Sequence, residues 1–339
     1  MPAIRTILVA VKDPAARSQP ALGKAARLAR AFGARLDLFH GITEPVLTDT
    51  YFYAEDEYRK FRHETRAKYR ESLEALALPL REQGIDVHVC ADWDYPAHEA
   101  IVRHARKHKT GLIVAECHQG RRLAPWLLHL TDWELLRTSP VPVLLIRSGA
   151  TWEDLNVLAA IDPSHRFAKP AKLDARILST ASMFTTALKG TLHVVHSYIP
   201  VPAGTVPLAG ASALVVEQIA QGSEARARQA FQQAVADYSL PPRRLHLEAG
   251  APVDAICRVA RELQSGLVVM DGLSRSGLKR VFIGNTAEQL LRALLCDVLV
   301  VKPQEFKSAV SRRSRGMHFV GQPYSLGANA TQPVRRRVS

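Results

Sequence analysis

The chain has 339 residues, more than the roughly 250–300 that a single hydrophobic core serves, so we expect two domains of about 150 residues each. Hydrophobic residues make up 47% and charged residues 23%, which excludes an intrinsically disordered chain, and no apolar run reaches the roughly 18 residues of a membrane span. The net charge of +13 raises a nucleic-acid hypothesis. Much of this charge lies after Glu305, where the chain has basic residues and no acidic ones, so residues 1–305 are only modestly basic and do not favour a nucleic-acid partner.

Residues 1–14 contain one short apolar run, which Lys12 and Asp13 close. A signal peptide needs a longer apolar region and a small-residue cleavage site, so we expect a cytoplasmic protein. That run is the first of five short strand patterns that alternate with helical patterns over residues 1–148. The predicted strands are Ile4–Val11, Arg35–Ile42, Asp86–Cys90, Leu112–Ala115 and Val143–Arg147; the predicted helices are Ala21–Phe32, Ala54–Gln83, Pro96–Lys107 and Thr131–Thr138.

Residues 152–305 repeat this order of elements. The predicted strands are Leu155–Ile161, Thr191–Tyr198, Arg244–Glu248, Leu267–Met270 and Val298–Lys302; the predicted helices are Ala171–Leu188, Ala211–Tyr238, Pro252–Leu263 and Thr286–Leu295. Residues 100–146 align without a gap onto residues 255–301. A repeat this long indicates duplication of a whole domain.

The last segment, residues 306–339, contains no acid and is rich in Ser, Gly, Pro and Arg. Its basic residues are Lys307, Arg312, Arg313, Arg315, Arg335, Arg336 and Arg337. Such a segment buries too little apolar surface to offset its ordering entropy, so we predict a disordered basic tail with a solubilising role. A contact arm for nucleic acid or another anionic surface is the alternative.

Alternating strands and helices predict an α/β fold, with two flavodoxin-like domains in tandem, each a doubly wound sheet of five parallel strands. Ligands of such sheets lie outside the carboxyl ends of the strands, at the switch point, so the loops after the first and fourth strands are the places to search. The fifth strands, Val143–Ile146 and Val298–Val301, would be exposed apolar edges if unpaired. We therefore expect the domains to pair through them within one chain.

Short motifs of the second domain resemble a known family. They are the strand Leu267–Met270, the run Gly284–Glu288, the strand Cys296–Val301 and Asp162-Pro163-Ser164 after the first strand. On these residues the chain resembles the universal stress protein family, and the tandem motifs Asp13-Pro14, Gln19–Leu22 and Thr131-Asp132-Trp133 resemble its two-domain members. The resemblance implies a cytoplasmic stress role without an established reaction. It also implies that ATP-binding members use an Asp after the first strand and a G-x₂-G-x₉-G-[ST] loop after the fourth.

In the second domain the three glycine positions of that loop fall on Asp271, Ser274 and Gly284, and Asn285 takes the Ser/Thr place. Asp271 puts a negative charge where phosphates would lie, so we do not expect tightly bound ATP. The helix start after Gly284 still favours an anion. We predict a small-molecule ligand cleft formed by Asp162, Gly272, Ser274, Gly277, Gly284, Asn285 and Thr286.

In the first domain the same positions are Glu116, Gln119 and His129, so we expect no nucleotide there. Several candidates also have structural explanations. Thr131 and Thr286 each match a helix-capping box, and Asp13 and Asp162 precede prolines in turns. His193 and His196 fit packed strand positions, and the pair Cys117-His118 lacks the other ligands of a zinc site.

The sequence contains no P-loop, nucleophile elbow or H-E-x-x-H motif, so we predict no enzyme activity, no catalytic residues, no cofactor and no metal. The four cysteines lack C-x-x-C spacing and indicate thiols rather than a disulfide framework. The leading hypothesis is a non-enzymatic stress-response protein with a nucleotide-like or lipid-like ligand in the second domain. The competing hypotheses are a weak ATPase or nucleotide-transfer enzyme, and a nucleic-acid-associated protein acting through its basic tail.

Overall fold

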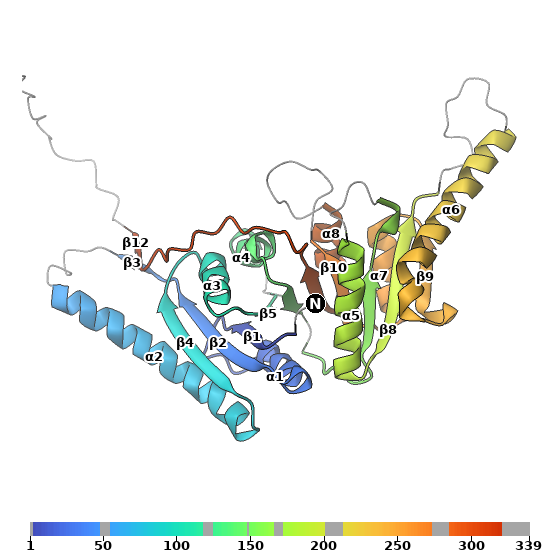
Figure 1. Ribbon diagram of the computed structural model, residues 1–339. Helices are drawn as coiled ribbons and strands as arrows, with labels where there is room; N and C mark the ends of the chain where they lie inside the picture. Colours follow the sequence, from blue (N-terminus) through green and yellow to red (C-terminus); the bar gives the residue numbers. More distant parts are fainter. Residues whose placement is uncertain are drawn as a thin grey trace, which may run out of the picture.

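The computed structural model describes residues 3–47, 55–117, 125–147, 149–165, 172–200, 213–272 and 285–320. One sheet of ten strands runs through the whole molecule (Figure 1). The first domain contributes β1 (Thr6–Ala10), β2 (Arg35–Ile42), β4 (Val87–Trp93), β5 (Leu112–Glu116) and β6 (Val143–Ile146). The second contributes β7 (Asn156–Ala160), β8 (Thr191–Tyr198), β9 (Leu245–Ala249), β10 (Leu267–Asp271) and β11 (Asp297–Val301). All ten predicted strands are confirmed.

The two domains are joined through their last strands. Strand β6 pairs antiparallel with β11, with Leu144 opposite Leu299 and Leu145 opposite Val298. The prediction of pairing through the fifth strands is confirmed. Because every other pair in the large sheet is parallel, the two five-stranded halves form one mixed sheet rather than two separate parallel sheets.

The strand order corrects one detail of the predicted fold. The sheet runs β4-β2-β1-β5-β6-β11-β10-β7-β8-β9, so each half has the order 3-2-1-4-5. A flavodoxin-like sheet has the order 2-1-3-4-5. Hydrophobic periodicity locates strands but carries no information on which parallel neighbour each one chooses. The order reverses between the first and fourth strands of each half, which makes their carboxyl ends the switch point.

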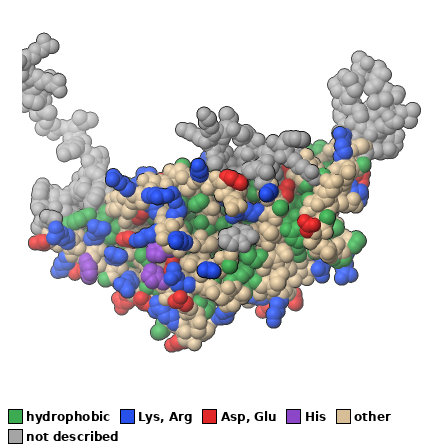
Figure 2. Space-filling model, viewed as in Figure 1, with side chains coloured by type: hydrophobic (Ala, Val, Ile, Leu, Met, Phe, Trp, Pro, Cys, Tyr) green, Lys and Arg blue, Asp and Glu red, His purple; other side chains and the backbone are tan. Residues whose placement is uncertain are grey.

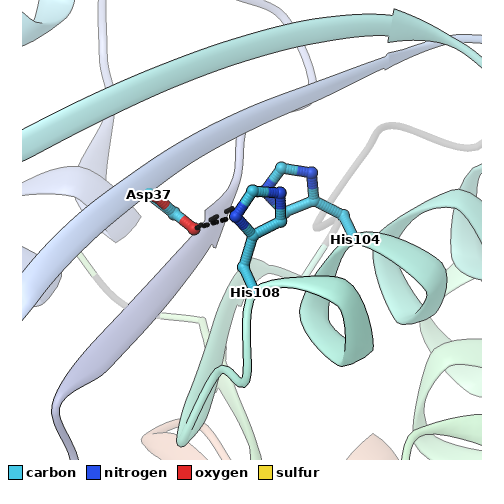
Figure 3. A group of neighbouring side chains, drawn as sticks. All are labelled: Asp37, His104 and His108. Carbon is cyan, nitrogen blue, oxygen red and sulfur yellow. Dashed lines mark ion pairs between the residues drawn. The ribbon is translucent and has the colours of Figure 1, made fainter.

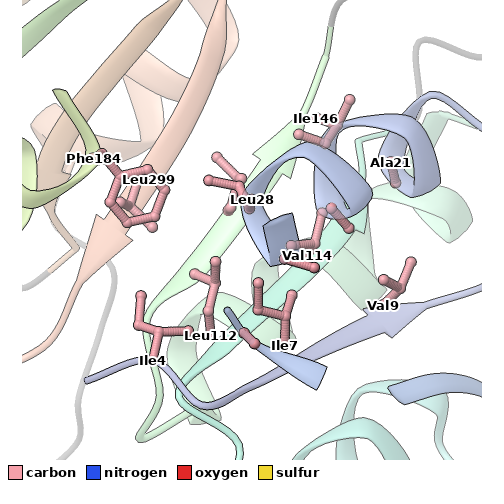
Figure 4. Close-up of a cluster of buried hydrophobic side chains, with 14 of the residues drawn as sticks. Ile4, Ile7, Val9, Ala21, Leu28, Leu112, Val114, Ile146, Phe184 and Leu299 are labelled. Atoms are coloured by element: carbon pink, nitrogen blue, oxygen red, sulfur yellow. The ribbon is translucent and has the colours of Figure 1, made fainter. Parts of the chain in front are cut away.

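Helices cover both faces of the sheet. Their bounds are α1 (Pro20–Phe32), α2 (Glu55–Glu82), α3 (Ala97–Lys107), α4 (Pro125–Thr138), α5 (Leu173–Leu188), α6 (Ala213–Val235), α7 (Pro252–Glu262) and α8 (Asn285–Ala293). Helices α1, α2, α5 and α6 pack on one face, where α1 and α5 meet across the domain boundary (Figure 4). Helices α3, α4, α7 and α8 pack on the other. Within the described residues, no helix is both long enough and apolar enough to span a bilayer.

Two predicted helix starts differ from the structure. Helix α4 begins at Pro125, so Thr131 lies inside it and the capping explanation for that residue is wrong. Helix α8 begins at Asn285, one residue before Thr286. The side-chain amide of Gln289 donates to Asn285 Oδ1 at 3.1 Å, so Gln289 contacts the first residue of the helix. A capping-box motif alone did not fix either boundary, which is the least certain part of a helix prediction.

Residues 306–320, which we call the strap, return from the second domain to cross the first (Figure 1). The strap ends in β12 (His318–Val320), which pairs parallel with β3 (Pro45–Leu47). Val310 and Met317 are buried, and Arg315 N donates to Asp94 Oδ1 at 2.9 Å. The predicted disorder is therefore wrong for the strap, because two apolar anchors and polar contacts with the first domain hold it. Residues 321–339 of the predicted tail lie outside the described residues.

Candidate ligand-binding site

The predicted site lies at the carboxyl edge of the second half of the sheet. Asp162 comes shortly after β7, and Gly272 directly follows β10. Because α8 connects two parallel strands, it must start near this edge, which places Asn285 and Thr286 there as well. The other predicted ligand residues, Ser274, Gly277 and Gly284, lie outside the described residues.

A buried histidine organises the loop that carries Asp162. His196 Nδ1 lies 3.3 Å from the carbonyl oxygen of Ile161, and His196 Nε2 lies 2.8 Å from Ser164 Oγ. The same ring lies 3.9 Å from Asp162 Oδ1, and the N–H of Asp162 donates to Asp174 Oδ1 at 3.0 Å. His196 is thus a packed strand histidine, as the sequence indicates.

The first domain repeats this arrangement. His40 Nδ1 lies 2.9 Å from the carbonyl oxygen of Val11, which follows β1 as Ile161 follows β7. The shared position and contact give the histidine a structural role in both domains. His193, the other predicted packed histidine, is also buried and lies 3.1 Å from His246, measured from Nδ1 to Nε2.

Lys302 is a residue of this edge that sequence reasoning missed. It directly follows β11 and is only 1% exposed, although it carries an amine. No described residue accepts a hydrogen bond from its Nζ, which lies 4.8 Å from the centre of the Phe306 ring. Burial lowers the pKa of Lys302 to about 8, and the nearby Asp271 carboxylate only partly opposes this. In the sequence, Lys302 ends an otherwise apolar strand pattern, and we interpreted it only as the last residue of that strand.

Gly272 has a clear packing reason. A Cβ at this position would lie 2.7 Å from Val300 Cγ1 and 3.8 Å from Lys302 Nζ. The absence of a side chain therefore lets the end of β10 approach β11 and the lysine closely. This close approach is a sufficient reason for glycine, whether or not a ligand contacts it.

The strand registers identify the equivalent residues in the first domain. Lys12 takes the place of Asp162, and Glu116 takes the place of Asp271. Glu116 Oε1 accepts a hydrogen bond from the N–H of Ala21 at 3.1 Å, in the first turn of α1. A protein carboxylate thus already occupies a helix N-terminus that would otherwise favour an anionic ligand. Asp13 lies one residue later than the Asp162 position, and its Oδ1 accepts from the N–H of Ala15 at 2.9 Å, as in the predicted turn.

The four cysteines, Cys90, Cys117, Cys257 and Cys296, are free and half-buried, which agrees with the absence of a disulfide framework. Burial raises the pKa of all four thiols, for Cys296 to about 12. Thiols in this state are weak nucleophiles.

The sequence profile of the Universal stress protein family matches residues 3–147 and 156–302. The chain belongs to this family and contains two of its domains in tandem. It is similar to the Universal stress protein E of Salmonella typhi, with 27% identity over 305 residues, 89% of this chain and 96% of that protein. The Universal stress protein E of Escherichia coli K12 is 26% identical over 305 residues, which again cover 89% of this chain and 96% of that protein.

Solved structures agree with this assignment. The crystal structure of a functionally unknown protein from Pseudomonas aeruginosa PAO1 is similar with a TM-score of 0.68 and 28% identity, covering 89% of this chain and 94% of that one. The crystal structure of a universal stress protein from Archaeoglobus fulgidus has a TM-score of 0.61 at 16% identity, covering 89% of this chain and 99% of that one. At this identity the similarity shows the fold alone.

Proposed function

We propose that this protein is a non-enzymatic stress-response protein that binds a small anionic ligand at the carboxyl edge of its second domain. The observation that carries the proposal is Lys302, a 1% exposed amine whose Nζ has no hydrogen-bond acceptor among the described residues. Burying such a group costs free energy unless it is paired. A ligand carboxylate or phosphate would supply the missing partner.

Neighbouring groups define the ligand further. The first N–H groups of a helix have no partner within the helix and its dipole favours an anion at this end, so the start of α8 adds a second group that favours an anion. Asp271 ends the adjacent strand and would repel a highly charged triphosphate. The combination favours a nucleotide-like or lipid-like ligand that brings fewer negative charges than ATP.

Asp162 supplies the polar contact on the far side of the switch point. Its backbone is fixed by Asp174 and its carboxylate lies near His196, so its position is set before any ligand arrives. A fixed acceptor suits recognition of a ligand hydroxyl or amine.

The experiment is mass spectrometry of small molecules retained through native purification, followed by calorimetric titration with AMP and ATP. Lys302→Met should weaken AMP binding at least tenfold, and Asp271→Asn should tighten ATP binding. Lys307→Met is the matched control, because Lys307 is exposed and lies five residues away. Equal binding by wild type and Lys302→Met would contradict the proposal.

A further inference from the structure

We propose that the first domain contains a binding site for a divalent transition-metal ion, formed by Asp37, His104 and His108. Asp37 lies on β2, His104 lies in the last turn of α3, and His108 follows at the end of that helix. The imidazole rings of His104, in α3, and of His108, directly after it, both project toward the Asp37 carboxylate (Figure 3). The three residues come from two elements that pack against each other, so the fold itself brings them together.

The spacing of the ligand atoms fits a metal ion. His104 Nε2 lies 3.6 Å from Asp37 Oδ2, and His108 Nδ1 lies 3.9 Å from the same oxygen. All three ligand atoms lie within 4.8 Å of one another. Ligand atoms about 2.0–2.2 Å from a tetrahedral Zn²⁺ lie about 3.4 Å apart. Small side-chain movements would therefore close the site around an ion.

The two histidines are held in place by stacking. The ring of His104 stacks on Phe39 with centroids 4.3 Å apart, and His108 stacks on His104 at 4.2 Å. This stack places a nitrogen of each ring near Asp37 Oδ2. Because an ion binds in the plane of each imidazole, the His108 ring must tilt out of the stack when both nitrogens bind one ion.

Asp37 is the strongest part of the argument. It is fully buried, at 0% exposure, and no described residue donates a hydrogen bond to either of its carboxylate oxygens. A buried carboxylate without such donors is costly, whereas a cation in direct contact would offset that cost. The next polar groups, Arg35 and His88, lie on the Oδ1 side: Arg35 Nε is 3.7 Å and His88 Nδ1 is 3.3 Å from Oδ1. The atoms nearest to Oδ2 are nitrogens of His104 and His108.

Because His88 contacts Oδ1 and not Oδ2 of Asp37, it is a positioning residue. His88 lies on β4 directly opposite Asp37 on β2, so strand pairing fixes its distance from the carboxylate. Contact with Oδ1 orients the carboxylate and leaves Oδ2 as the metal ligand, a common arrangement around metal sites. Arg35 opposes cation binding through its charge, which excludes weakly held ions such as Mg²⁺ more than it excludes a metal with strong imidazole ligands.

Histidine side chains reach the surface of the first domain among Lys and Arg side chains (Figure 2). The side chain of His108 is 26% exposed, so an ion can approach it from solvent.

The site opens into a cavity of about 660 Å³ that His104 and His108 line together with Cys90, and with Arg312 and Ser314 of the strap. Two imidazoles and one carboxylate leave at least one coordination position for water or a small ligand. Zn²⁺, Fe²⁺ or Co²⁺ suits this donor set, whereas Mg²⁺ and Ca²⁺ prefer oxygen ligands.

The test uses the full chain, stripped with a chelator and titrated with Zn²⁺ and Co²⁺. We expect one equivalent of Zn²⁺ to bind, and Co²⁺ to give the strong visible absorption of a four- or five-coordinate site. Asp37→Asn and His108→Gln should weaken Zn²⁺ binding at least tenfold. His88→Gln should weaken it less and leave the Co²⁺ spectrum similar in shape.

The matched control is His193→Gln in the second domain. His193 occupies the register position on β8 that Asp37 occupies on β2, and its ring lies beside that of His246. Among the described residues, this pair is not part of a three-residue group that could bind a metal. This control should bind Zn²⁺ like wild type, and circular dichroism should show that all variants are folded. Zn²⁺ binding that is absent, or that survives both Asp37→Asn and His108→Gln in folded protein, would overturn the proposal.

Discussion

Asp297 Oδ2 lies 2.5 Å from Lys24 Nζ, so a buried ion pair links the start of β11 in the second domain to α1 in the first. Asp297 is 0% exposed and Lys24 7%. The same carboxylate accepts hydrogen bonds from Arg147 N and Trp152 Nε1, each at 2.8 Å. One side chain therefore holds both domains and the connection between them.

Asp297→Asn should destabilise the protein by about 3–5 kcal/mol, because it removes the buried carboxylate that forms an ion pair with Lys24. The free energy of unfolding in urea measures the effect. Asp254→Asn is the control, since Asp254 is exposed and its replacement should change stability by less than about 0.5 kcal/mol. A loss below about 1 kcal/mol for Asp297→Asn would contradict the prediction.

Phe32 of α1 and Phe184 of α5 should show energetic coupling across the domain boundary. Their ring centroids lie 5.3 Å apart in an edge-to-face arrangement. A double-mutant cycle with Phe32→Leu and Phe184→Leu should give a coupling of about 0.5–1.5 kcal/mol. Additive effects of the two substitutions on urea unfolding would mean that the domains do not pack through these helices in solution.

Lys302→Met should stabilise the protein at neutral pH. The folded pKa of about 8 lies below the ordinary 10.5, so keeping this amine protonated in the folded state costs on the order of 3 kcal/mol. That cost is fully present below pH 8, shrinks as the pH rises toward 10.5, and is absent above it. Thermal unfolding should therefore show a higher midpoint for Lys302→Met at pH 7, with the advantage disappearing near pH 10. Lys307→Met should show no difference at either pH.

Removing the strap should destabilise the first domain. A chain ending at Glu305 loses the burial of Val310 and Met317, each worth about 1.5–3 kcal/mol, and the contact of Arg315 with Asp94. Hydrogen exchange should become faster in α3, because Arg106 of that helix donates to the carbonyl oxygen of Val310 at 2.8 Å. A chain ending at Val320 is the control and should exchange like the full chain; equal exchange in both truncated chains would refute a stabilising strap.

Much of the fold follows from local sequence patterns. Strands such as β5 and β11 are buried on both faces, so they appear as continuous apolar runs that are easy to recognise. The pairing of β6 with β11 across the domains follows from the need to cover an apolar edge. The strand order does not follow, because each parallel strand could satisfy its hydrogen bonds beside several neighbours.

The site residues were harder to predict. Asp162 and Gly272 are adjacent to strands and were placed by topology, whereas Lys302 looked like an ordinary strand end. Asp37 on β2 lies more than sixty positions before His104 and His108, so only the structure shows that the three proposed metal ligands lie together. The four-residue spacing of His104 and His108 on a helical pattern was the one available signal.

The strand pair β6–β11 has a consequence for the protein in the cell. Because both strands belong to one chain, their association is a unimolecular event whose equilibrium does not depend on protein concentration. Two separate single-domain subunits would dissociate on dilution, but this sheet stays assembled however few copies are present. The two halves are also inherited together, so one half can lose or exchange its binding residues while the other keeps its own.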